Sequence, residues 1–499
     1  MKFDKYMVER SVESSIYFPP FGMNDLAFDW SGKELEISIL KPLEADRTYI
    51  LTIGARAQDT RGNYLGKAYN LVFSTGERVD TGMVSGTVYA QKAESYTVAA
   101  FPVTPDIDTL RPAMTLPRYV TQSDDSGRYV LKGLSDGKYR LICFDDQMRN
   151  YTYAPQYDLY ASATRDVSIS EFVNRVEGVN FIPAMEDTSH PQLYSAELTN
   201  TGLLLLKFSE PLDTSHIRPS YFVVSDSVTG MRLPVDFAAR LESNRYNVVL
   251  ETDTPLKSRT KYFVTAGDSI SDSYGNRMAQ SNNTVTFIPD TNLVPFIPYF
   301  FNFPDSLRGV SSYDTLYCQF AAPSIEGHIA SPSCVLLDSS GDPIANRVAP
   351  ESGTIYRVYL HGLISREWYT LCLNYKTYVN GAEKDSLVKR SFAMVDSNSL
   401  GDITGTVTGI QRGAEVVVAA EGENGKTYHA LADSTGGFEI AGIPAGDYSL
   451  KAYVRRGKSV RYFNGRSFPY QFAEPFGVYD GKLKIRARWT VEGVAVRLH

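Results

Sequence analysis

The chain has little of what catalytic and metal-binding sites are usually built from. Its 499 residues include only six histidines, four cysteines and three tryptophans. The histidines are scattered, so the short spacings of common zinc sites do not occur. The sequence also lacks the glycine patterns of phosphate-binding and dinucleotide sites and the Gly-x-Ser-x-Gly pattern of a serine nucleophile. It therefore predicts a protein that is not an enzyme and holds no cofactor and no metal.

Long apolar runs and clusters of positive charge are also scarce. The longest apolar run, residues 293–301, contains two prolines and is far shorter than the roughly 20 residues that a membrane-spanning helix needs. The formal net charge is −7, and no basic cluster is longer than Arg455-Arg456. Nucleic-acid-binding proteins usually present a basic face. We therefore expect no transmembrane segment in this chain and no nucleic-acid partner.

The cysteines do not form a recognisable framework. Cys143 stands alone, and no pair has the CxxC spacing of zinc or redox sites. Cys318 and Cys372 lie in strand-like runs, where burial as small apolar residues and disulfide formation are both open. The disulfide state of Cys318, Cys334 and Cys372 therefore stays open at the level of sequence.

Alternation of apolar and polar residues is widespread, whereas helical periodicity is almost missing. Short alternating runs are separated by Gly, Pro, Asn and Asp every 8–12 residues or so, which is typical of β-sandwiches. The 33 tyrosines suit half-buried strand positions. The sequence therefore predicts an all-β protein built from tandem sandwiches.

One type of internal repeat occupies segments 42–76 and 255–287. In both, a Pro-Leu pair is followed after seven residues by a tyrosine (Tyr49, Tyr262) and ten residues later by an Asp-x-x-Gly-Asn turn. A weaker third copy has Tyr369 but carries Asn380-Gly381 in place of that turn. We call this repeat type A, and its third copy A′.

A second repeat, type B, occupies segments 84–139 and 403–448. In both, a turn glycine is followed two residues later by an aromatic residue and twelve residues later by a tyrosine (Tyr139, Tyr448). The repeats predict five modules in the order A-B-A-A′-B and place the recurring tyrosines in the sandwich cores. The expected modules are residues 1–80, 81–186, 187–290, 291–397 and 398–499, called the first to fifth modules below.

The motifs resemble two known families of β-sandwich. The type A modules resemble the bacterial Ig-like domain of the S-layer SbsA type, whose Phe-Ser-Glu-Pro-Leu-Asp motif is present at residues 208–213. The type B modules resemble CnaB-like or carboxypeptidase-regulatory-like sandwiches of prealbumin-like fold. The combination is similar to surface lipoproteins of Bacteroidota and Chlorobi-type bacteria. This resemblance implies a location at the cell envelope, on the outer surface or in the periplasm.

The same resemblance shapes the expectation for the N-terminus. Residues 3–6 align with the middle of a type A module, at the position of residues 208–211 in the third module. The first strand of the first module, and a lipid-anchored cysteine upstream of Met1, are therefore expected to be missing from this chain. An incomplete sandwich would leave an open sheet edge.

A few residues could carry binding. The aromatic run 462–472 offers Tyr462, Phe463, Phe468 and Tyr470 as a weak candidate site for a glycan or a partner protein. The other interpretation is a long loop folded against the last sandwich. The Asp-rich turn 268–276 offers oxygen ligands for calcium, although turn capping explains the same residues.

Together these observations predict a non-catalytic protein of the cell envelope. It would act as a spacer, a scaffold or an adhesion-type stalk, and this hypothesis predicts an extended particle. The alternative is a surface module that binds a glycan or a protein through its aromatic loops. The partner and the mode of anchoring stay open.

Overall fold

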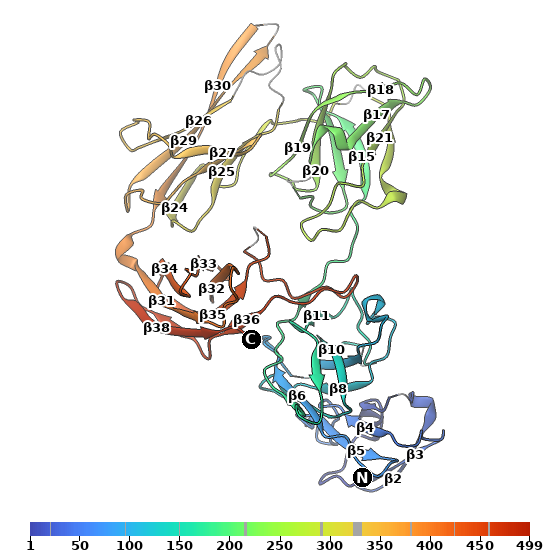
Figure 1. Cartoon of the computed structure of the whole chain (residues 1–499). Helices are drawn as coiled ribbons and strands as arrows, with labels where there is room; N and C mark the ends of the chain where they lie inside the picture. Colours follow the sequence, from blue (N-terminus) through green and yellow to red (C-terminus); the bar gives the residue numbers. More distant parts are fainter. Residues whose placement is uncertain are drawn as a thin grey trace.

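The chain is almost entirely β-structure in the computed structural model, which describes all residues except 20, 95, 149, 214–216, 290–292, 323–331, 380–381, 424 and 458–459 (Figure 1). The predicted all-β fold of tandem sandwiches is confirmed. None of the helices in the described residues has the length and apolar character needed to cross a membrane. These helices are α1 (Glu9–Glu13), η1 (Met23–Asp25), η2 (Ile107–Thr109), η4 (Pro219–Tyr221), η5 (Gln280–Asn282) and η6 (Ser397–Ser399).

The third module shows the complete type A sandwich. Two four-stranded sheets, in the orders β15-β16-β20-β19 and β18-β17-β21-β22, pack face to face. Leu204, Leu206 and Phe208 of one sheet share a core with Val224 and Val264 of the other. The strands are β15 (Leu193–Leu198), β16 (Leu204–Phe208), β17 (Phe222–Asp226), β18 (Arg232–Leu233), β19 (Val235–Arg240), β20 (Asn247–Thr252), β21 (Tyr262–Ala266) and β22 (Thr284–Phe287).

The first module is a smaller version of the same sandwich. It has a three-stranded sheet, β1-β4-β5, and a two-stranded sheet, β2-β3. Lys2 pairs with Glu34 on β3. In the third module Lys207 of β16 pairs with Asn247 on β20 in the same way. Met1–Phe3 therefore occupy the position of the end of β16. The strands are β1 (Ile16–Tyr17), β2 (Leu26–Ser31), β3 (Glu34–Ile39), β4 (Thr48–Ile53) and β5 (Tyr69–Ser74).

The edge of β3 beyond Leu35 is open within the described residues. Within the described residues the first module has no counterpart of β15 or of the start of β16. A hollow of about 480 Å³ lies there, lined by Leu35, Ile37, Leu71 and Phe73 among others. Leu250, which corresponds to Ile37 in the third module, is fully buried, whereas Ile37 is only half-buried. Part of the core of this module is thus uncovered.

The fourth module is a third type A sandwich, although its sequence is divergent. Its sheets have the orders β23-β25-β28-β27 and β24-β30-β29-β26. The turn expected at Asn380-Gly381 lies outside the described residues. The strands are β23 (Tyr299–Phe301), β24 (Ser306–Val310), β25 (Leu316–Phe320), β26 (Ser333–Leu337), β27 (Val348–Ser352), β28 (Ile355–Val358), β29 (Trp368–Val379) and β30 (Ala382–Met394).

A tyrosine corner links the three type A modules. Tyr49, Tyr262 and Tyr369 are buried, and each hydroxyl accepts a hydrogen bond from the backbone N–H five residues earlier, at 2.7–3.0 Å. Each ring stacks on a phenylalanine of the next strand at 5.7–5.8 Å between centroids. Because the fourth module repeats both contacts, its weak sequence resemblance reflects the same local structure. The stacked partners are Phe73, Phe287 and Phe392.

The second and fifth modules share the type B sandwich. Each has a three-stranded sheet, β13-β6-β9 or β34-β31-β38. In the second module β6 runs parallel to β13, and in the fifth module β31 runs parallel to β38. A Cβ on Gly86 would lie 1.9 Å from the carbonyl oxygen of Val179, and a Cβ on Gly405 would lie 2.0 Å from that of Val494. No side chain fits there, which explains the repeated glycine. The larger sheets are β14-β11-β10-β7-β8 with β12, and β33-β32-β35-β36 with β37.

The recurring tyrosines of these modules, Tyr139 and Tyr448, are buried in the cores, as predicted. The strands of the second module are β6 (Gly82–Thr87), β7 (Thr97–Pro102), β8 (Tyr119–Gln122), β9 (Arg128–Leu134), β10 (Gly137–Phe144), β11 (Leu159–Ser162), β12 (Val167–Ile169), β13 (Arg175–Val176) and β14 (Ala184–Met185). Those of the fifth are β31 (Leu400–Thr408), β32 (Val416–Gly422), β33 (Thr427–Leu431), β34 (Gly437–Pro444), β35 (Gly446–Val454), β36 (Phe476–Val478), β37 (Leu483–Ile485) and β38 (Thr490–Arg497).

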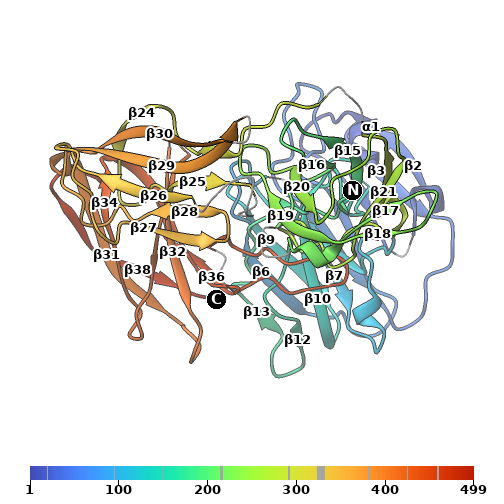
Figure 2. The same cartoon turned by 90° about the horizontal axis from the view of Figure 1, so that it is seen from above.

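The second to fifth modules close into a ring rather than forming an extended row. Figures 1 and 2 show the chain running from the second module through the third and fourth to the fifth, which returns to lie beside the second. Tyr89 and Ile182 of the second module pack on Val417 and Phe476 of the fifth. The extended particle expected for a spacer, scaffold or stalk is therefore wrong, because the last module turns back onto the second.

Specific contacts join the modules around the ring. Between the third and fourth modules, Gln319 accepts a hydrogen bond from the backbone N–H of Glu242 at 2.7 Å and donates one to the carbonyl of Arg240. Between the fourth and fifth, the rings of Tyr313 and Tyr428 meet edge to face at 5.4 Å. These side chains are polar or aromatic, as is common where modules of one chain pack together.

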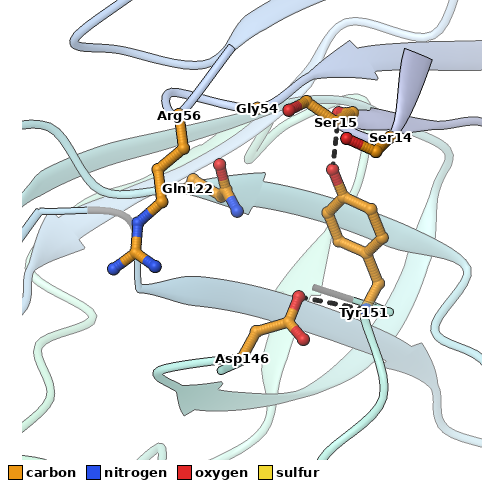
Figure 3. A pocket seen from close by; sticks show the side chains of 7 residues that line it. All are labelled: Ser14, Ser15, Gly54, Arg56, Gln122, Asp146 and Tyr151. Atoms are coloured by element: carbon orange, nitrogen blue, oxygen red, sulfur yellow. Dashed lines mark hydrogen bonds between the residues drawn. The ribbon is translucent and has the colours of Figure 1, made fainter. Parts of the chain in front are cut away.

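The first module sits outside the ring and is fixed to the second. Tyr151 donates a hydrogen bond from its hydroxyl to the carbonyl of Ser15 at 2.6 Å (Figure 3). Gln122 accepts one from the N–H of Ala55. Asp146 accepts from the N–H of Tyr151, and burial raises the pKa of this carboxyl. The cavity between these groups is only about 20 Å³, so they hold the modules together rather than form a pocket.

Candidate functional site at the junction of three modules

The predicted aromatic site lies on residues 460–475, which join β35 to β36 and which we call the strap. Tyr462 packs edge to face on Tyr453 and Phe476 of the fifth module, at 5.5 and 5.3 Å between centroids. Burial raises the pKa of the Tyr462 phenol well above its usual value. Phe463 lies beneath the guanidinium of Arg456 at 4.1 Å. These two rings therefore pack within the fifth module.

Tyr470 reaches across to the second module. Its ring covers the guanidinium of Arg140 at 4.2 Å, and Phe472 lies 5.1 Å from the same group. Arg140 is buried and forms a two-pronged ion pair with Asp166, with N–O distances of 2.9 and 3.2 Å. A buried arginine needs such a partner, and the aromatic cover keeps water from the pair. Nothing in the sequence spacing of these residues signals this contact.

Phe468 is the most accessible of the four predicted aromatic residues. It is 44% exposed, and Arg111 lies over its ring at 4.4 Å. Tyr462, Phe463 and Tyr470 face neighbouring side chains within the chain, so the four rings do not share one open face. The geometry favours a structural role for the strap, and ligand binding by these four residues stays a prediction.

The backbone of the strap extends the edge of the large sheet in the second module. The N–H of Ser162 donates to the carbonyl of Asn464 at 2.9 Å, and its hydroxyl donates to the carbonyl of Gln471 at 2.9 Å. The Asn464 amide donates in turn to the carbonyl of Tyr160. The strap thus covers groups that an edge strand would otherwise leave unpaired.

The strap also reaches the third module and its linker. Arg466 donates to the side-chain oxygen of Asn276 at 2.6 Å. The N–H of Ser467 donates to Glu186, whose other oxygen accepts from the hydroxyl of Tyr153. Three modules therefore meet around the strap, at a cavity of about 450 Å³ lined by acidic, basic and aromatic side chains.

The Asp-rich turn of the third module lies at this junction. One oxygen of Asp272 accepts hydrogen bonds from the N–H groups of Tyr274 and Asn276, and the other accepts from the Asn276 amide. Asp59 caps the corresponding turn of the first module in the same way. Turn capping is therefore confirmed as the local role of both aspartates.

Two further carboxylates lie beside Asp272. Ligand oxygens of Asp187, Glu210 and Asp272 all fall within 4.8 Å of one another. In the first module the position of Glu210 is taken by Lys5, whose ammonium pairs with Asp59 at 3.4 Å. Partial burial and the two neighbouring acids raise the pKa of Glu210. Calcium binding at this turn stays a prediction.

Removal of the Glu210 charge is expected to stabilise the third module at neutral pH. Because the folded protein holds a proton on Glu210 more tightly than the unfolded chain does, stability falls as pH rises through the raised pKa. Glu210→Gln removes this loss of stability. The urea midpoint of the variant should therefore exceed that of the wild type by an amount that grows between about pH 4 and pH 7. Hydrogen exchange of β20 and β21 would locate the effect in this module.

The matched control is Asp236→Asn, at an exposed carboxylate on β19 outside the cluster. It should leave the pH profile of the wild type unchanged. If the wild type and Glu210→Gln lost stability in parallel over this pH range, the crowding of the three acids would have no energetic effect.

Other candidate residues serve local structure. Asp145 accepts from the N–H of Leu159, and Asp146 accepts from those of Asn150 and Tyr151, so these adjacent carboxylates cap loops. His190 contacts a backbone carbonyl, whereas His216 and His328 lie outside the described residues. Cys143 and Cys372 are buried, and Cys318 and Cys334 lie side by side.

Comparison with known proteins agrees with the type A sandwiches. Two modules match the bacterial Ig-like domain family. The matched residues are 1–75 and 183–288, just over a third of the chain. The Ig-like character predicted for the first and third modules is thus confirmed, whereas the finer SbsA-type and CnaB-like resemblances stay predictions. No curated protein matches the sequence.

Solved structures give weak likenesses. The N-terminal part of the bacterial S-layer protein SbsC is 13% identical over 41% of this chain and 44% of its own, with a TM-score of 0.19. The major pilin subunit BcpA of Bacillus cereus is 10% identical over 85% and 99%, with a TM-score of 0.14. An alpha-2-macroglobulin fragment from Escherichia coli is 14% identical over 54% and 95%, with a TM-score of 0.17. At these scores the likenesses carry no argument about function or module arrangement.

Proposed function

We propose that the protein is a non-catalytic structural component of the cell envelope, on the outer surface or in the periplasm, and that it acts as a scaffold. The match of two modules to bacterial Ig-like domains supports a structural or adhesion-type role at the cell surface. The ring of four modules favours a scaffold over an extended stalk. The strap joins the second, third and fifth modules, so these modules cannot extend in a row.

Binding of a glycan or a protein through the aromatic loop is the less supported alternative. Most of the rings that could form a binding platform contact other parts of the chain. Arg140, which lies against the ring of Tyr470, and Arg466 of the strap are also engaged within the molecule. A scaffold uses such side chains to hold its modules in place.

Surface labelling tests this function. In cells that naturally produce the protein, a membrane-impermeant biotin reagent should label it on intact cells or after osmotic release of the periplasm. A cytoplasmic enzyme should stay unlabelled in the same samples. Recovery of the protein only with that cytoplasmic control, after lysis, would overturn the envelope assignment.

A further inference from the structure

Two cysteines of the fourth module face each other across the sandwich. Cys318 lies on β25 and Cys334 on β26, and these strands belong to different sheets. Their sulfur atoms are 3.0 Å apart, although the residues are 16 positions apart in the chain. A bond between them would therefore join the two layers of this module.

The surroundings of the two cysteines determine which thiol reacts first. Cys318 is fully buried in the core, and the contact with Cys334 and burial raise the pKa of its thiol. Cys334 is half-buried and only packs against that core, so it is the more accessible sulfur. Since a thiolate must begin the exchange, Cys334 is the sulfur that reacts first with an external disulfide.

We propose that Cys318 and Cys334 form an inter-sheet disulfide in an oxidising compartment. The oxidant is an external disulfide, either of a thiol–disulfide oxidoreductase or of glutathione. The Cys334 thiolate attacks one of its sulfurs and releases one thiol. Cys318 then loses its proton, attacks the Cys334 sulfur and releases the second thiol. Two protein thiols are oxidised, and one external disulfide is reduced to two thiols.

The other two cysteines are poorly placed for this bond. Cys372 on β29 lies opposite Val335, whereas its neighbours Leu371 and Leu373 point into the core. Because side chains alternate along a strand, Cys372 faces away from the pair. Cys143 is buried in the core of the second module. Both therefore serve as internal controls.

Formation of the bond has a measurable consequence for the fourth module. A disulfide that closes a loop of this length restricts the unfolded chain and also ties the two sheets together. We expect the unfolding temperature of this module to rise by an amount on the order of 10 °C on oxidation. Cys372→Ser should show the same rise, whereas Cys318→Ser and Cys334→Ser should lose it.

The test uses the full chain purified in reduced form and then oxidised with a glutathione redox buffer. Intact mass should fall by about 2 Da, and peptide mapping after alkylation should show Cys318 joined to Cys334. Recovery of both residues as alkylated thiols, or a bond that includes Cys143 or Cys372, would overturn the proposal. Mapping of the wild type does not depend on whether the serine variants fold.

The bond in the cell rests on the proposed envelope location, because the cytoplasm keeps thiols reduced. The two ideas can fail separately. Oxidation of the purified chain reports on the geometry of the pair wherever the protein resides. Surface labelling reports on location whatever the state of its cysteines.

Discussion

Gly465→Ala is expected to open the ring of modules. Gly465 lies in the strap with a φ of +93°, and a Cβ there would be 1.9 Å from the hydroxyl oxygen and 2.8 Å from the Cβ of Ser162 in the second module. It would also lie 2.8 Å from the carbonyl oxygen of Gln471. The added methyl group therefore blocks the strap where it meets the second module.

The expected size of this effect follows from the cost of overpacking. A forced contact of this kind typically costs about 1–3 kcal/mol, which lowers the ring-closing equilibrium roughly 5- to 150-fold. Hydrogen exchange at the backbone N–H of Ser162, which the strap protects, should become faster by a similar factor. Small-angle X-ray scattering should report a larger maximum dimension.

Gly481→Ala is the matched control. Gly481 lies in the same module with a φ of +94°, but a Cβ there would meet nothing within 4 Å. Both variants therefore carry the same backbone strain, and only Gly465→Ala adds the clash with Ser162. If both variants kept the scattering profile and exchange rates of the wild type, the strap would not hold the ring closed.

Adding counterparts of β15 and of the start of β16 is expected to stabilise the first module. Residues 193–205 of the third module form β15, the following turn and the start of β16, and Met1 occupies the position of Leu206. A copy of this segment placed directly before Met1 should therefore pair with the open edge of β3. Leu203→Thr and Leu205→Thr in the copy would keep its outer face polar.

The gain comes from burial of apolar surface. In the third module Leu193 and Leu204 lie in the shared core, and their copies should cover Ile37 and Leu71 in the hollow of the first module. A fully buried leucine contributes about 1.5–3 kcal/mol. The unfolding temperature of the first module should therefore rise by an amount on the order of 10 °C.

The comparison for this extension is the same segment with Leu193→Ser and Leu204→Ser. It has equal length and charge but cannot fill the core. Hydrogen exchange of β2 and β3 should slow with the first extension and not with the second. Equal exchange in both would mean that the hollow does not accept a strand.

The local structure of this protein could be predicted from its sequence, and the contacts between modules could not. Tyr49 and Tyr262 recur at fixed distances from a Pro-Leu pair and an Asp-x-x-Gly-Asn turn, because the corner needs only residues close in the chain. The type B tyrosines are predictable for the same reason. Such repeats establish the all-β fold and the similarity of the modules to one another.

The strap shows where this prediction stops. Its aromatic residues are conspicuous in the sequence, but their role depends on Arg140 and Ser162, which lie about 300 positions earlier. No spacing rule connects residues so far apart, so the sequence predicts an extended row of modules and misses the ring. In the acidic cluster, Glu210 belongs to a visible motif, whereas its closeness to Asp187 becomes visible only in the fold.

Closure of the ring also sets the order in which the protein can mature. Asn464 and Tyr160 are 304 positions apart. The strap can therefore pair with the sheet edge of the second module only after nearly the whole chain has been synthesised. Contacts this distant form slowly, because a long segment must first be brought together. Until then, backbone groups of β11 and β14 that the strap later covers are unpaired, and they can form hydrogen bonds with a neighbouring chain. Nascent molecules at high local concentration would be most prone to aggregate at this edge.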